Sequence, residues 1–199
     1  MTAITTTLFL PFIGLHVQPA MVGPQYVNIV WVNTPQDTWN DEDKDNNRRA
    51  INSALQWWEI RTFYRSSTAF VTFYTTESNI LIDTDILSLN VCRDRSWLID
   101  KPITPTLYMI AVNPTYRALI CDEVIVGDYN EDQWAIVWGG LIYDSPTDQA
   151  VVAHTVGHLY GAADGPSQDI MDKDYLVQSY IGGVIAESTW KAIGYESIH

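Results

Sequence analysis

Two histidines, His154 and His158, lie four residues apart within the stretch Ala150–Asp164. On a helix this spacing places both side chains on one face, with about 5–6 Å between their Cβ atoms. Two imidazole nitrogens can then bind one metal ion, at about 2.0–2.1 Å if the ion is zinc. Gly161 follows three residues later, where a left-handed conformation can end the helix and turn the chain back. We expect Asp164 to return as the third ligand, because three protein ligands and one open position are typical of a catalytic zinc site.

Each of these residues has a simpler interpretation when it is taken alone. A pair of helix histidines is often part of a surface or a core, and an aspartate after a helix is often a turn residue. Nothing in helix packing requires His154, His158 and Asp164 together, so their joint placement predicts a metal site. A metal-free interaction or structural domain, in which the histidines are vestigial, stays the alternative.

The stretch resembles the metzincin family of zinc peptidases, whose signature is H-E-x-x-H-x-x-G-x-x-H/D followed by a methionine-containing turn. His154, His158 and Asp164 match the three ligands, and Gly161 matches the turn glycine. Met171, in Asp169-Ile170-Met171-Asp172, matches the methionine of the Met-turn. Aspartate as the third ligand is similar to the snapalysin-like branch. The resemblance implies a Zn²⁺ cofactor, an extracellular or cell-surface zinc endopeptidase, and a metzincin-like fold.

The resemblance also implies a substrate and a closing helix. Gly139, Gly140, Leu141 and Ile142 resemble the edge strand that, in this family, pairs with an extended peptide or protein above the cleft. The segment from 185 to 194 resembles the C-terminal helix. Tyr175 lies four residues after the methionine instead of two, so we expect a structural role for it.

The sequence departs from the family at Thr155, which stands where the family has glutamate. In zinc peptidases that glutamate takes a proton from the attacking water and delivers it to the leaving amine. Threonine does neither at neutral pH, and losing such help costs on the order of 10²–10⁴ in rate. None of the nearby aspartates, at 144, 148, 169 and 172, has the required helical placement. We therefore expect little or no peptidase activity.

Three explanations of Thr155 stay open. The first is a natural loss that left a binding or structural protein, a pseudopeptidase, on a peptidase scaffold. The second is a substitution introduced into an active zinc endopeptidase. In the third, another residue supplies the base.

The composition is that of an ordinary globular protein of 199 residues, 47% hydrophobic and 18% charged. We expect one domain over 1–199, with an upper part over about 1–160 and a lower part over about 161–199. The 24 acidic and 11 basic residues give a net charge of −13, which would repel a nucleic-acid backbone. The apolar segment from 7 to 22 is too short and too interrupted by prolines to span a bilayer, and no basic residue precedes it as in a secretory signal. The only cysteines, Cys92 and Cys121, allow a single disulfide or two buried thiols.

The remaining patterns predict an α/β (α+β) fold with a mixed, mostly parallel twisted sheet and an early backing helix. Strand patterns cover 26–33, 69–75, 107–112, 118–126 and 134–143, and an amphipathic helix covers 43–62. The acidic run Asp41–Asp45 suits a helix N-terminus. It is a poor EF-hand loop, because Asn46 and Asn52 replace the glycine and glutamate that calcium loops need. For the histidine-bearing helix we expect Thr147 or Asp148 as the cap.

Overall fold

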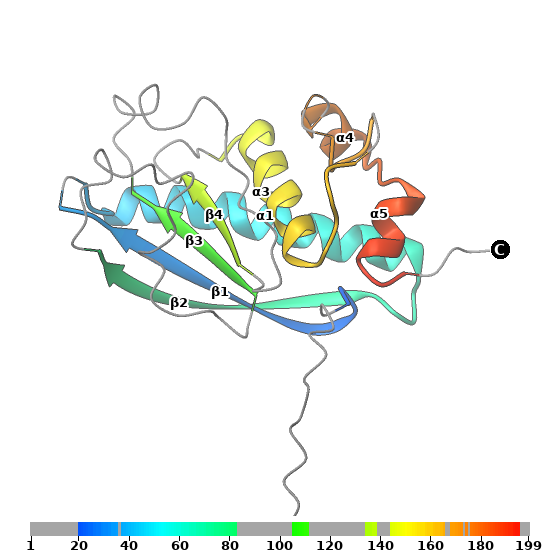
Figure 1. The fold of residues 1–199 in the computed structure, drawn as a ribbon, viewed down its shortest axis with the longest axis horizontal. Helices are drawn as coiled ribbons and strands as arrows, with labels where there is room; N and C mark the ends of the chain where they lie inside the picture. The colour runs from blue at the N-terminus through cyan, green and yellow to red at the C-terminus, as the bar shows by residue number, and fades with distance from the viewer. Residues whose placement is uncertain are drawn as a thin grey trace, which may run out of the picture.

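The computed structural model describes residues 20–35, 37–82, 105–111, 134–138, 144–165, 168–172, 174 and 176–195, with the backbone alone for 134–138. Four strands form one sheet in the order β2-β1-β3-β4, and the three pairings between them are all parallel. The strands are β1 (Gly23–Asn33), β2 (Val71–Leu81), β3 (Thr106–Ile110) and β4 (Trp134–Trp138). The helices are α1 (Asp41–Arg65), α3 (Pro146–Leu159), α4 (Leu176–Gly182) and α5 (Glu187–Ala192). The prediction of an α/β fold is confirmed, and the sheet, predicted as mixed and mostly parallel, is parallel at every pairing among its described strands (Figure 1).

The strand β1 lies inside the sheet, between β2 and β3. Its run Ile29–Val32 is buried without alternation, which is typical of a parallel strand covered on both faces. β3 is buried along its whole length, whereas most of β2 is exposed or half-buried. The strands predicted at 26–33 and 107–112 therefore occur. The one predicted at 69–75 extends to Leu81, and the one predicted at 118–126 lies outside the described residues.

Helix α1 lies along the sheet and contacts β2 and α3 (Figure 1). Asn40 caps it by accepting a hydrogen bond from the backbone N–H of Asp43 at 2.8 Å. Asp41, Glu42 and Asp43 occupy its first turn, where the helix dipole favours negative charge. The acidic run is thus the start of a helix, as its composition predicts.

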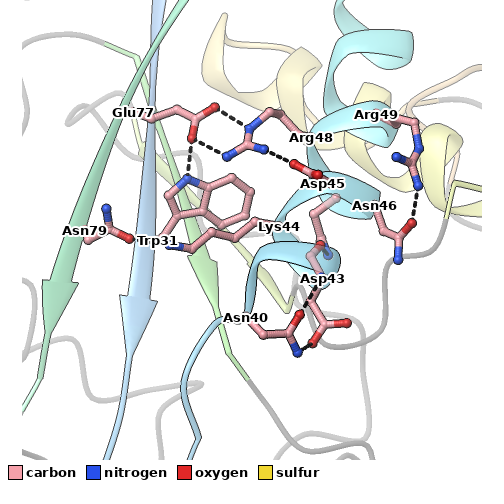
Figure 2. A network of polar contacts seen from close by, with 11 residues as sticks. Trp31, Asn40, Asp43, Lys44, Asp45, Asn46, Arg48, Arg49, Glu77 and Asn79 are labelled. Carbon is pink, nitrogen blue, oxygen red and sulfur yellow. Dashed lines mark hydrogen bonds and ion pairs between the residues drawn. The ribbon is translucent and has the colours of Figure 1, made fainter.

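A polar network joins α1 to the strands β1 and β2 (Figure 2). The indole Nε1 of Trp31, on β1, donates to Oε2 of Glu77, on β2, at 2.8 Å. The Nε of Arg48, on α1, donates to Oε1 of the same carboxylate at 2.7 Å. The Arg48 guanidinium also lies 5.6 Å from the centre of the Trp31 ring. Glu77 therefore connects three elements and satisfies a buried indole.

The C-terminal helices pack against the far end of α1. Trp57 donates to the carbonyl oxygen of Tyr180 at 2.8 Å, and the two rings stack with 5.3 Å between centroids. Arg65 forms an ion pair with Glu187 at 2.7 Å. The helix predicted at 185–194 occurs as the shorter α5, while α4 is an element that the sequence patterns did not predict.

The first and last described segments meet beside α5. The backbone N–H of Met21 donates to the carbonyl oxygen of Ile193 at 2.8 Å. The hydroxyl of Tyr195 donates to the carbonyl oxygen of Met21 at 3.0 Å. The start of β1 is thus fixed by residues near the end of the chain. The division into an upper and a lower part stays a prediction.

Candidate metal centre

Helix α3 carries the two histidines, and its start differs from the prediction. Ser145 is the cap, because its hydroxyl accepts the backbone N–H of Asp148 at 3.3 Å. Pro146 then occupies the first turn, where its missing N–H and fixed φ suit a helix start. The expected caps, Thr147 and Asp148, are instead inside the first turn. Pro146 favours the first turn of a helix, so the residue before it, Ser145, becomes the cap.

The two imidazoles are buried and face each other. His154 is 1% exposed and His158 is 3% exposed, and their Nε2 atoms lie 3.0 Å apart. The Nδ1 of His154 lies 2.9 Å from the carbonyl oxygen of Ile170, and the Nδ1 of His158 lies 2.7 Å from that of Ala162. A carbonyl oxygen only accepts, so each Nδ1 carries the hydrogen and each Nε2 presents a lone pair. Two lone pairs therefore point into the same small space.

The chain after α3 returns to the histidines, as the sequence predicts. Gly161 has φ +91°, a left-handed conformation that favours glycine, and its N–H donates to the carbonyl oxygen of His158 at 3.0 Å. Ala162 donates to the carbonyl oxygen of Gly157 at 3.1 Å. This turn brings Oδ1 of Asp164 to 3.6 Å from Nε2 of His154 and to 3.5 Å from Nε2 of His158. The Asp164 side chain is 70% exposed, so the group is open to solvent on the carboxylate side.

The segment with Met171 lies directly against α3. Met171 is fully buried, and a Cβ added at Gly157 would lie 2.5 Å from its sulfur atom. Gly157 directly precedes His158, so the methionine packs against α3 within its histidine-bearing stretch. The backbone N–H of Gly165, next to Asp164, donates to the carbonyl oxygen of Met171 at 2.8 Å. Backbone hydrogen bonds thus join the aspartate loop to the methionine segment.

Gly157 and Gly165 are positioning residues that the sequence interpretation missed. A Cβ at Gly165 would lie 2.8 Å from Oδ2 of Asp169 and 2.9 Å from Cβ of Met171. Both glycines therefore allow a close approach between segments. Gly157 could have been recognised in the sequence, because glycine inside a helix is unfavourable and its presence there indicates close packing by another segment.

The three candidate ligand atoms have the spacing of a metal site. Ligand atoms about 2.0–2.1 Å from a tetrahedral zinc ion lie about 3.3 Å from one another. Here the three separations are 3.0, 3.5 and 3.6 Å. His154, His158 and Asp164 form the one group of this kind in the part of the chain that the structure describes. The group can hold a metal ion.

Burial keeps the histidines in the form that binds metals. It lowers the pKa of His154, although the bond to Ile170 and the charges of Asp164, Asp169 and Asp172 act in the opposite direction. Burial and the adjacent His154 lower the pKa of His158 to about 4. Both imidazoles are therefore neutral at pH 7, as metal ligation requires.

Comparisons with known protein families, with curated proteins and with solved structures found no match. Among the described helices, none has the length and the apolarity to cross a membrane.

Thr155 is 1% exposed, and its hydroxyl donates to the carbonyl oxygen of Val151 at 2.9 Å. The hydroxyl is therefore engaged with its own helix. The side chain is also covered by the surrounding structure. Several predicted site residues lie outside the described residues: Gly139, Gly140, Leu141, Ile142, Tyr175, Cys92 and Cys121.

Proposed function

We propose that this chain is a zinc-binding domain of metzincin type that lacks the proton-transfer residue of a working peptidase. The observation that supports it best is the pair of Nε2 atoms, 3.0 Å apart in a buried position. Neither can donate to the other while both Nδ1 atoms donate to carbonyl oxygens. A cation between them removes the repulsion between the lone pairs.

The ligand set favours zinc over other common ions. Two imidazole nitrogens and one carboxylate oxygen suit zinc, whereas calcium and magnesium prefer oxygen ligands alone. When bound, a zinc ion with an open position supplies a Lewis acid and lowers the pKa of coordinated water. The exposure of Asp164 provides the open side. The carbonyl oxygens of Ile170 and Ala162 orient the two imidazoles, as outer partners of metal ligands do.

Thr155 supports a binding role for the site instead of hydrolysis. Its side chain has no acid or base function at neutral pH, and its hydroxyl bonds to Val151. We propose an extended peptide or protein as the ligand, by resemblance to the family and its edge strand. An active extracellular endopeptidase with a substituted glutamate is the second candidate, and the packing of Met171 against Gly157 on α3 supports both candidates equally.

Metal content is the direct test. Protein purified without added zinc and dialysed should carry about one zinc per chain by elemental analysis, and His158→Ala should carry almost none. His199→Ala is the matched control, since it removes a histidine outside the proposed site and should keep the metal. Circular dichroism confirms that each variant is folded. A metal-free parent that cannot be loaded with zinc, or a His158→Ala variant that binds as much zinc as the parent, refutes the proposal and leaves the metal-free interaction domain.

A further inference from the structure

Asp169, beside the methionine segment, is a buried carboxylate with only half of its acceptors satisfied. The residue is 1% exposed. Its Oδ2 accepts a hydrogen bond from the hydroxyl of Thr189, on α5. Its Oδ1 is buried and has no hydrogen-bond partner. No lysine or arginine in the described part of the chain forms an ion pair with it.

Such a group is costly unless a positive charge lies nearby. Transferring an ionised carboxylate from water into the protein interior costs several kcal/mol when no partner compensates its charge. The Thr189 hydroxyl supplies one neutral donor, which does not balance a full charge. The described residues therefore contain a buried carboxylate without a cationic partner.

The position of Asp169 connects it to both parts of the proposed site. The next residue, Ile170, accepts the hydrogen bond from Nδ1 of His154. The Asp169 carboxylate lies against Gly165, whose added Cβ would be 2.8 Å from Oδ2, and Gly165 follows Asp164 directly. The carboxylate thus lies between the segment that orients one ligand and the loop that carries another. Its charge also acts on the imidazole of His154, whose pKa it tends to raise.

We propose that Asp169 is a positioning residue whose missing counter-charge is the metal ion at His154, His158 and Asp164. Its negative charge stabilises the metal-bound protein and destabilises the metal-free protein. The inference rests on the proposed metal site. It adds a fourth acidic or imidazole group that acts on the ion through space without being a ligand.

Asp169→Asn tests this, because it keeps the size and an acceptor for Thr189 and replaces the oxygen without a partner by a neutral amide NH2. Zinc affinity is measured by competition with a chromophoric chelator, and the melting temperature is measured on the metal-free protein. We expect zinc affinity to fall about 10- to 100-fold, the usual cost of changing an outer partner of a metal site. The melting temperature of the metal-free form should stay the same or rise by about 2–4 °C. A residue with a merely structural role would lower it.

Two controls separate the charge from the packing. Thr189→Val removes the hydrogen bond to Asp169 and keeps the charge, so it should lower the metal-free melting temperature and leave zinc affinity within about threefold. Asp174→Asn removes an equal charge from an exposed position close in sequence and should change neither quantity. If the parent binds no zinc, the proposed function itself fails. If the parent binds zinc and Asp169→Asn binds it equally, or melts lower without metal, only the role of Asp169 is overturned.

Discussion

Thr155→Glu restores the residue that the metzincin signature has after the first histidine, and it tests whether the missing proton transfer is the only defect. Position 155 lies on α3 and directly follows His154, the first ligand histidine. We expect the longer glutamate side chain to extend from this covered position to water at the open side of the metal group, to take a proton from it and to return the proton to a leaving amine. We expect Thr155→Glu to cleave peptides at least about 100-fold faster than the parent.

The expected magnitudes follow from the surroundings of Thr155. A hundredfold gain is about 2.7 kcal/mol of transition-state stabilisation, the low end of what a general base supplies. Stability should move in the opposite direction, because Thr155 is 1% exposed and its bond to Val151 is lost. That bond contributes about 0.5–1.5 kcal/mol, and burying the new charge adds several kcal/mol in the metal-free protein. Zinc at 100 times its dissociation constant should restore about 2.7 kcal/mol.

The assay is cleavage of a quenched fluorescent peptide library, with zinc and with a chelator. Thr155→Gln is the matched control, since it has nearly the same shape and cannot accept a proton at neutral pH. Only the glutamate variant should gain activity, and the chelator should abolish the gain. If Thr155→Glu binds zinc, stays folded and is as inert as Thr155→Gln, the cleft has been lost as well, and this reasoning is refuted.

Three further predictions concern stability. Histidine in the unfolded chain has a pKa near 6.5, whereas the pKa of His158 in the folded protein is about 4. The free energy of unfolding of the metal-free protein should therefore fall by about 1.4 kcal/mol per pH unit as the pH is lowered from about 6.5 to about 4. Urea midpoints that do not change between pH 7 and pH 5 would contradict this prediction. Gly157→Ala places a Cβ 2.5 Å from the Met171 sulfur, which costs about 1–3 kcal/mol of stability by overpacking. Alanine favours the helix by about 1 kcal/mol over glycine, so the free energy of unfolding should fall by up to about 2 kcal/mol. A variant that is more stable than the parent in urea would contradict this prediction. Glu77→Ala leaves the buried indole of Trp31 without its hydrogen-bond acceptor and should cost about 1–3 kcal/mol of stability. Glu77→Gln keeps an acceptor and loses only the ion pair with Arg48, so it should cost less than about 1 kcal/mol. Equal changes in melting temperature for the two variants would show that the ion pair, and not the indole hydrogen bond, contributes the stability.

The metal group was predictable because its geometry is local. The spacing of His154 and His158 and the glycine three residues later determine where the imidazoles point and where the chain turns. The observed φ of +91° at Gly161 and the return of Asp164 follow from that arrangement. The central strand was predictable for a similar reason, since its β-branched run is continuous.

Contacts between distant segments were not predictable. The pairing of β1 with β2 and β3, the packing of Met171 against Gly157, and the burial of Thr155 all depend on tertiary structure. α4 was missed because it spans only seven residues, fewer than the window in which a helical repeat of apolar residues can be recognised. The extension of β2 to Leu81 was missed because its exposed residues show no alternation.

The bonds between Met21 and the segment Ile193–Tyr195 have a consequence for biosynthesis. The hydroxyl of Tyr195 reaches a residue 174 positions earlier in the chain. At about 5–20 residues per second, a ribosome makes that second residue about 10–35 s after the first. The segment before β1 is therefore made long before its partners near Tyr195 exist, and these hydrogen bonds cannot form until residues 193–195 have been synthesised.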